Sequence, residues 1–181
     1  VSELKKQILK QFGKHPLENP NYGKIINEKH FQRLQNLLHT SQHVWGGQCD
    51  DGELRIAPAI LDNVTWDDAV MQEEIFGPVV VIQKFKTLDE VIDLANASEY
   101  GLGGAVFTKN IDTALKVARS VRTGRMWVNT YNDLPAGAPF GGYKKSGIGR
   151  ETHKVLLEHY SQLKNILINL REGVSGMYDV K

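Results

Sequence analysis

The chain has 181 residues, of which 41% are hydrophobic, and its 22 Lys and Arg residues nearly balance its 21 Asp and Glu residues, so the formal net charge is +1. This composition is typical of a globular protein with one core, and the balanced charge argues against a dedicated nucleic-acid or membrane-surface protein. No apolar run reaches the length of about 18 residues that spans a bilayer, and no secretory signal pattern opens the chain. The single cysteine, Cys49, fits a reducing compartment. We therefore expect a cytoplasmic protein with neither nucleic acid nor a membrane as its partner.

The first third of the chain predicts two amphipathic helices and then an extended segment. One helix ends near Gly13, and a second begins after Asn27, which is a suitable N-cap residue. The apolar residues at helical spacing are Leu4, Ile8, Leu9 and Phe12 in the first helix, and Phe31, Leu34, Leu37 and Leu38 in the second. Residues 54–61 follow as extended chain that is interrupted by Pro58.

The middle of the chain alternates apolar runs with helical patterns. The apolar runs are predicted strands and cover residues 79–82, 105–107 and 126–128. Thr87 and Glu90 form a capping-box pattern at the start of one helix, and Asn110 can cap the next, with Gly124 expected to end it in the left-handed conformation. This order predicts the α/β fold class, with an open, twisted, mostly parallel sheet flanked by helices.

A Gly/Pro-rich loop follows over residues 129–149. A loop of this length inside a compact α/β unit is uncommon and usually functional. Leu156, Leu157 and Tyr160 then predict a short helix, and residues 166–168 predict a last strand.

Two adjacent carboxylates, Glu73 and Glu74, stand shortly before the first predicted strand. One reading is structural, with both residues closing a short helix that begins at Asp67. The other reading is functional, because a carboxylate can accept hydrogen bonds from sugar hydroxyls in a dinucleotide site. The pattern by itself leaves both readings open.

Several motifs in fixed order carry a family resemblance. Residues 73–78 (EEIFGP) and residues 127–129 (WVN) with 139–151 (PFGGYKKSGIGRE) are similar to two signatures of the NAD(P)-dependent aldehyde dehydrogenase superfamily. Residues 22–27 and 30–34 resemble the short, class-3-like members, whereas the segment from 151 to 166 resembles bacterial-type members. The resemblance extends over nearly the whole chain.

The resemblance implies the catalytic-domain fold of that family, truncated at its N-terminal side. Residues 1–160 would be a partial catalytic domain and residues 161–181 an oligomerisation strand and tail, with 165–170 as an edge strand. The cofactor-binding domain, the nucleophilic cysteine and the general-base glutamate would all lie upstream of Val1, so we predict no catalytic residue in this chain.

The resemblance also implies supporting roles for particular residues. Glu74 matches the carboxylate that holds the nicotinamide ribose, Phe76 matches an aromatic residue near the nicotinamide, and Leu102 matches an apolar residue near the cofactor. Phe140 matches an aromatic residue of the aldehyde tunnel, which residues 132–138 would also line. The cofactor would be NAD or NADP in the full-length enzyme, and neither is expected to bind tightly to this chain alone.

Two other candidate sites are weak. Cys49 follows Gly47-Gln48, but it lies in a polar turn without a nearby basic residue that would lower its pKa, so we interpret it as an inert thiol. His39 and His43 have the spacing of two zinc ligands on a helix, but no third ligand is evident, and we predict no metal site.

Two function classes follow from the sequence. In the first, the chain is part of an oligomeric oxidoreductase that converts an aldehyde to a carboxylic acid with NAD(P) through a cysteine thioester, and it is inactive in isolation. In the second, it is a non-catalytic, truncated module that associates through an exposed strand edge.

Overall fold

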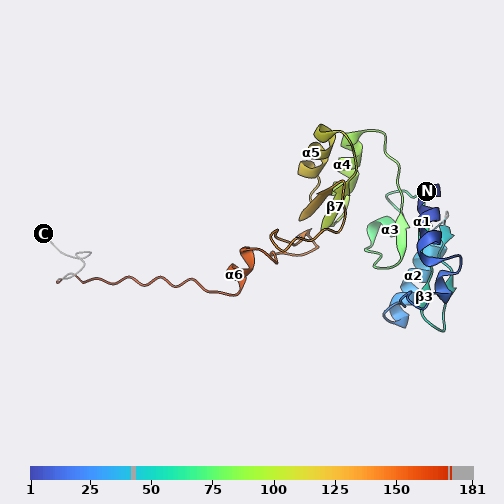
Figure 1. The fold of residues 1–181 in the computed structure, drawn as a ribbon, viewed down its shortest axis with the longest axis horizontal. Coiled ribbons are helices and arrows are strands. Elements are labelled where there is room, and N and C mark those ends of the chain that lie inside the picture. Colours follow the sequence, from blue (N-terminus) through green and yellow to red (C-terminus); the bar gives the residue numbers. More distant parts are fainter. Residues whose placement is uncertain (42–43, 171, 173–181) are drawn as a thin grey trace. The chain divides into compact units, whose positions relative to one another are not determined.

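A computed structural model describes residues 1–41, 44–170 and 172 of the chain (Figure 1). The chain divides into two compact units. The first unit comprises Val1–Glu99 with Thr108–Arg122, and the second comprises Tyr100–Phe107 with Thr123–Lys181. The predicted division at residue 160 differs from these units and stays a prediction.

The helices of the first unit follow the capping signals of the sequence. They are α1 (Ser2–Phe12), a 3₁₀ turn (Pro16–Glu18), α2 (Glu28–Thr40), α3 (Ala69–Gln72), α4 (Leu88–Ala97) and α5 (Ile111–Ser120). The Asn27 side chain accepts a hydrogen bond from the backbone N–H of His30 at the start of α2, at 2.8 Å. Thr87 and Glu90 form the predicted capping box of α4, and Asn110 caps α5. Local polar side chains thus fix where α2, α4 and α5 begin, whereas α1 and α3 have no side-chain cap.

The core of the first unit lies between α2 and a small mixed sheet. The sheet contains β1 (Val44–Gly46), β4 (Ala59–Leu61) and β5 (Val79–Val81), in the order β1-β4-β5. A separate hairpin is formed by β2 (Cys49–Asp50) and β3 (Arg55–Ile56). β4 is antiparallel to β1 and parallel to β5. All four predicted apolar residues of α2 are buried, and they pack in one cluster with Ile56, Ala59, Leu61 and Val70.

Helices α4 and α5 lie side by side (Figure 1). Lys116 of α5 forms an ion pair with Asp89 of α4 at 2.5 Å. The Asn96 side chain donates to the carbonyl of Ser120 at 2.9 Å and accepts from the N–H of Arg122 at 2.7 Å. Asn96 therefore ties the end of α4 to the end of α5.

The second unit contains two strand pairs and a short helix. The elements are β6 (Tyr100–Gly101), β7 (Gly103–Val106), β8 (Arg125–Val128), β9 (Tyr143–Lys144) and α6 (Val155–His159). β7 and β8 are parallel, with Gly103 opposite Arg125, whereas β6 and β9 are antiparallel. The helix α5 joins β7 to β8 in sequence, so the predicted β-α-β connection is confirmed there. The α/β class is confirmed as well, with mixed sheets.

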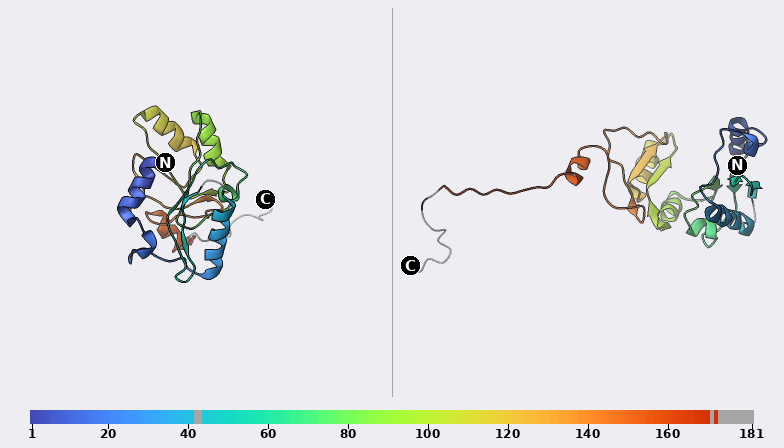
Figure 2. Two further views of the ribbon diagram at one scale, coloured as in Figure 1. Left: turned by 90° about the vertical axis from the view of Figure 1, so that its right-hand side faces the viewer. Right: turned by 90° about the horizontal axis from the view of Figure 1, so that it is seen from below.

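Two local predictions are wrong. Residues 165–170 form no strand, and residues 161–170 run as extended chain (Figure 2). A strand needs a hydrogen-bonded neighbouring strand, and none of the strand pairings in the described part of the chain involves residues 165–170. The rest of the predicted tail, residue 171 and residues 173–181, lies outside the described residues.

Gly124 does not end α5 in a left-handed conformation, because that helix stops at Ser120 and its C-cap residue is Val121. Gly124 instead allows a close approach of two backbone segments. A Cβ atom at Gly124 would lie 1.6 Å from the carbonyl oxygen of Gly141, so only glycine fits there.

Candidate functional site

The loop that carries the acidic pair is held by α2. The Arg33 guanidinium forms an ion pair with Glu73 at 3.2 Å and also donates to the carbonyl of Ile75. Its Nε donates to Nδ1 of His30 at 3.3 Å, and Nε2 of His30 lies 2.8 Å from the carbonyl oxygen of Phe76. Two residues of α2 thus contact the Glu73 side chain and the backbone carbonyls of Ile75 and Phe76.

These contacts define the tautomer of His30. A guanidinium N–H can only donate, so Nδ1 of His30 accepts and its Nε2–H donates to the Phe76 carbonyl. The bond holds Phe76 at φ 54°, in the left-handed region that non-glycine residues rarely adopt. Phe76 is also 78% exposed. Backbone strain of this kind persists where the surroundings fix the conformation.

The two carboxylates therefore have different surroundings. The helix α3 ends at Gln72, and Glu73 is its C-cap residue and the partner of Arg33. Glu74 is exposed, and no hydrogen bond or ion pair to it is present among the described residues. The structural reading holds for Glu73, while Glu74 remains available for a ligand.

Phe76 borders an open groove of about 510 Å³ in the first unit. The groove is lined by Ile26, Asn27, Lys29, His30, Arg33 and Phe76. Ile26 and Phe76 are both highly exposed, at 83% and 78%. The groove thus presents apolar side chains beside two cationic ones.

The Gly-rich loop of the second unit borders a second open cavity, of about 320 Å³. Leu102 and Phe140 both line it, together with His159 and the glycines around Arg150. The structure therefore brings the predicted residues Leu102 and Phe140 to one cavity. Glu74 and Phe76 lie together on a loop of the first unit.

Backbone hydrogen bonds set the shape of this loop. Phe140 and Glu151 exchange two of them, at 2.9 and 2.7 Å. Arg150 donates to the carbonyls of Gly142 and Gly149, at 2.9 and 2.6 Å. The hydroxyl of Ser146 accepts from the N–H of Gly101 at 2.9 Å. The Lys144-Lys145-Ser146 stretch is therefore held by internal bonds of the unit.

Cys49 has the environment of an inert thiol. It is half-buried, and its Sγ–H donates to the carbonyl of Gly47 at 3.4 Å. Burial raises the pKa of the Cys49 thiol, the negative charge of Asp51 raises it further, and a hydrogen bond with the Gln35 side chain partly opposes both. A raised pKa lowers the fraction of reactive thiolate, as predicted.

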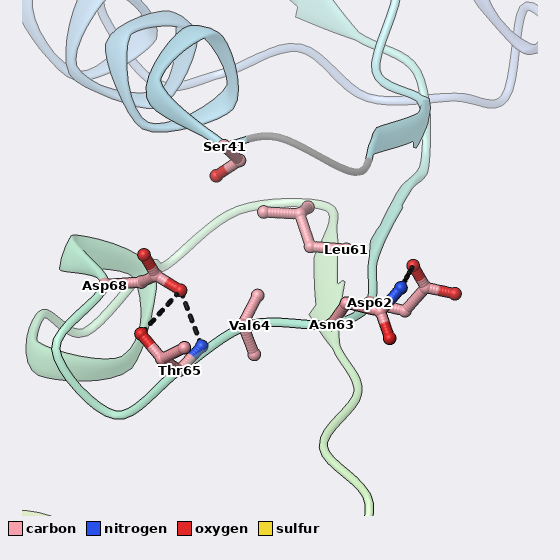
Figure 3. Close-up of a pocket in the computed structure, with 7 residues that line it drawn as sticks. All are labelled: Ser41, Leu61, Asp62, Asn63, Val64, Thr65 and Asp68. Carbon is pink, nitrogen blue, oxygen red and sulfur yellow. Dashed lines mark hydrogen bonds between the residues drawn. The ribbon is translucent and has the colours of Figure 1, made fainter.

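A further pocket of about 250 Å³ lies between the end of α2 and the segment before α3 (Figure 3). The Asp68 carboxylate, which lines this pocket, accepts hydrogen bonds from the backbone N–H and the hydroxyl of Thr65, at 2.6 and 3.2 Å. Asp62 accepts from the Asn63 amide at 3.4 Å. These carboxylates serve the turn before α3.

Neither a metal cluster nor a membrane-spanning helix is found in the described part of the chain. No group of three or more His, Cys, Asp or Glu side chains there could hold a metal ion. None of its helices combines the length and the apolar character needed to cross a bilayer. His43, one of the two histidines at zinc-ligand spacing, lies outside the described residues.

Sequence reasoning did not single out His30, Arg33 or Arg125. The i, i+3 spacing of His30 and Arg33 places them on one face of α2, but only the structure shows that this face meets residues 73–76. Arg125 donates to the carbonyls of Asp133, Ala138 and Pro139, and its position two residues before Trp127 on β8 places both side chains on one face.

Comparison with known proteins identifies the family. The sequence model of the aldehyde dehydrogenase family matches residues 1–166. An aldehyde dehydrogenase from Davidiella tassiana is 42% identical over 161 residues, which cover 85% of this chain and 32% of that protein.

Solved structures give the same result. The NAD-dependent aldehyde dehydrogenase from Sinorhizobium meliloti has a TM-score of 0.78 and 36% identity, covering 87% of this chain and 33% of that chain. Betaine aldehyde dehydrogenase from Staphylococcus aureus in complex with NAD⁺ has a TM-score of 0.81 and 35% identity, covering 90% of this chain and 34% of that chain. This chain therefore spans only 32–34% of the length of these relatives. With the family model matched over residues 1–166, the chain belongs to the aldehyde dehydrogenase family.

Proposed function

We propose that this chain supplies part of the catalytic region of an enzyme that oxidises an aldehyde to a carboxylic acid with NAD(P). The reaction proceeds through a thioester on a cysteine that lies outside this chain, as does the general-base glutamate. The chain contributes the groups that position the cofactor and the aldehyde. Support comes from the family membership and from Cys49, whose raised pKa and half-buried position disfavour it as the nucleophile.

The observation that carries this proposal is the separation of the two carboxylates. Arg33 engages Glu73, whereas Glu74 is exposed on a loop of fixed conformation. An ionised carboxylate is acceptor-only, and it suits a pair of ribose hydroxyls. Glu74 and Phe76 thus fit the ribose and the adjoining ring of NAD(P), which supplies the hydride acceptor when bound.

The aldehyde side of the proposal rests on the cavity of the second unit. Phe140 and Leu102 line it, and the backbone bonds between Phe140 and Glu151 hold the Phe140 position. Orientation of the reacting groups is a large part of catalysis, and a displacement of 1 Å can cost about 100-fold in rate. Phe140 therefore acts by positioning the aldehyde chain, and Leu102 by apolar contact near the cofactor.

The test uses an enzyme made by joining this chain to the preceding segment of the Sinorhizobium meliloti relative, hereafter the joined enzyme. Glu74→Gln removes the negative charge and is expected to raise the KM for NAD about tenfold, because a charge-assisted hydrogen bond contributes about 1.5 kcal/mol. Glu73→Gln is the matched control and should leave that KM within about twofold. Equal KM values for the two variants would contradict the assigned role of Glu74.

A second candidate function is favoured by the exposed apolar residues at the C-terminal end. Leu163, Leu167 and Leu170 are 90% or more exposed, and Ile166 and Ile168 lie between them at 68% and 72%. An exposed apolar run of this kind favours self-association. Under this proposal the chain forms a homo-oligomer through residues 161–170, with or without catalysis.

A further inference from the structure

Arg125, the first residue of β8, directs its guanidinium at the backbone of the loop that follows the strand. Its Nη1 donates to the carbonyl of Asp133 at 3.3 Å, and its Nη2 donates to the carbonyls of Ala138 and Pro139, each at 3.2 Å. The guanidinium carbon also lies 5.2 Å from the centre of the Phe140 ring. One side chain thus contacts both ends of residues 133–140.

Trp127 continues this surface. Residues two apart on a strand share a face, and the guanidinium of Arg125 lies 5.9 Å from the centre of the Trp127 ring. The Trp127 indole N–H donates to the same Asp133 carbonyl at 2.8 Å, and its ring lies 5.3 Å from that of Tyr131. Gly103 leaves room for this indole, because a Cβ there would lie 2.8 Å from the Trp127 ring.

The opposite side of the loop is held by residues after the glycine-rich turn. The Thr152 hydroxyl donates to the Ala138 carbonyl at 2.5 Å, and the backbone of Glu151 pairs with that of Phe140. The Ala138 carbonyl therefore accepts from two side chains. Planar guanidinium groups suit such multiple acceptors, since their donors are fixed in one fork.

Arg125 has no carboxylate partner in the described part of the chain, where the ion pairs involve other residues. Its acceptors are all carbonyl oxygens of the loop, so its charge and donors serve the backbone conformation. Fixing a residue's backbone costs about 1–2 kcal/mol in conformational entropy, so a loop of this length needs such contacts to stay in one conformation.

The contacts from Arg125 and Trp127 use only backbone atoms of residues 133–139. The side chains of this segment can therefore change without loss of these bonds. Leu134 is 52% exposed and Tyr131, just before the segment, is 70% exposed. The loop thus separates a fixed backbone from side chains that face outward.

We propose that Arg125 is a positioning residue that holds the backbone of residues 133–139 in one conformation. The positioning claim stands on the geometry alone. Its effect on aldehyde binding rests on the proposed function, because that effect requires residues 132–140 to face the aldehyde.

The first experiment measures hydrogen exchange of the tryptophan indole N–H groups in the ¹⁵N-labelled 181-residue chain. Arg125→Met is expected to accelerate exchange at Trp127 about tenfold and to leave Trp45 and Trp66 unchanged, with Arg125→Lys giving a smaller effect. Arg122→Met, at an exposed arginine outside the loop contacts, is the matched control. Unchanged exchange at Trp127, or equal acceleration at all three tryptophans, would overturn the positioning claim.

The second experiment uses the joined enzyme. Arg125→Met should raise the KM for aldehydes about tenfold with the KM for NAD unchanged, and Arg122→Met should leave both KM values unchanged. An unchanged KM for aldehydes in Arg125→Met would overturn the effect on aldehyde binding. A joined enzyme that is inactive with every aldehyde would instead overturn the proposed function, while the indole exchange still decides the role of Arg125.

Discussion

At the scale of single residues, one guanidinium decides which of two adjacent carboxylates is available. Arg33 binds Glu73 and the Ile75 carbonyl, and it orients His30 toward Phe76. Adjacent residues in extended chain point to opposite sides, so the partner of one carboxylate cannot readily reach the other. Both carboxylates are exposed, and the Arg33 contact of Glu73 is what distinguishes them.

Arg33→Met is expected to loosen this loop and to lower the free energy of unfolding by about 1 kcal/mol, which is the value of one net hydrogen bond. The ion pair adds little, because both partners are partly exposed to solvent. Urea unfolding measures the effect, and Arg119→Met on the exposed face of α5 is the control. A midpoint equal to that of the control would show that Arg33 does not hold the loop.

At the scale of elements, the N-terminal segment is attached to the hairpin β2–β3 by hydrogen bonds, one of them from the Ile25 N–H to the Leu54 carbonyl at 2.8 Å. The Tyr22 hydroxyl donates to the Ile56 carbonyl at 2.6 Å, and Arg55 donates to the Leu17 carbonyl at 2.9 Å. The Tyr22 ring also packs edge-on against Phe12, the last residue of α1, at 5.4 Å between ring centres. These contacts connect α1 to the core through its following turn.

Tyr22 gives this attachment a defined pH dependence. Burial raises the pKa of Tyr22 to about 12 from 10.0. The folded chain therefore keeps this proton at a pH where the unfolded chain has lost it, and the free energy of unfolding should fall as the pH rises from 10 to 12.

Tyr22→Phe tests this dependence. The variant should lose about 1 kcal/mol at pH 7, where the hydrogen bond is intact, and it should lack the additional fall above pH 10. The measurement is urea unfolding at several pH values. A parallel decline in both proteins above pH 10 would mean that other groups cause it.

The elements that the sequence predicts well are those specified by neighbouring residues. The side chains of Asn27, Thr87 and Asn110 each accept a hydrogen bond from the backbone N–H three residues later and so cap a helix. The buried face of α2 follows the spacing of its apolar residues. The predictions that Gly124 ends α5 and that residues 165–170 form a strand were wrong, because both features depend on distant partners. Gly124 lies against the backbone of Gly141, and a strand requires a second chain segment to pair with.

The candidate site shows the same division. Motif order led to Glu74, Phe76, Leu102 and Phe140, and their assigned roles stay predictions. The geometry adds that Glu73 and Glu74 differ, which depends on Arg33, a residue 40 positions away from Glu73. No local pattern contains that information.

At the scale of the whole molecule, this chain matches only part of its relatives, 32% of one and 33% of another. It also carries an exposed apolar run at residues 161–170. Surfaces of this kind are normally covered by other protein. The chain is therefore expected to associate through this exposed run.

Sedimentation velocity tests the association of the chain. The full 181-residue chain is expected to sediment as oligomers at micromolar concentration, and a chain ending at residue 160 should sediment as a monomer. Replacing Leu163 and Leu167 with Asp should have a similar effect, since charges on an exposed apolar extended segment oppose its pairing with another chain. A monomeric full-length chain would contradict association through this segment.

The central claim is that this chain positions cofactor and aldehyde but does not supply the nucleophile. NADH formation across a panel of aldehydes tests it, with the 181-residue chain, its Cys49→Ser variant and the joined enzyme measured side by side. The account predicts no turnover by the chain alone and turnover by the joined enzyme that is insensitive to Cys49→Ser. Turnover by the chain alone that is lost in Cys49→Ser would contradict it, because Cys49 would then be the nucleophile.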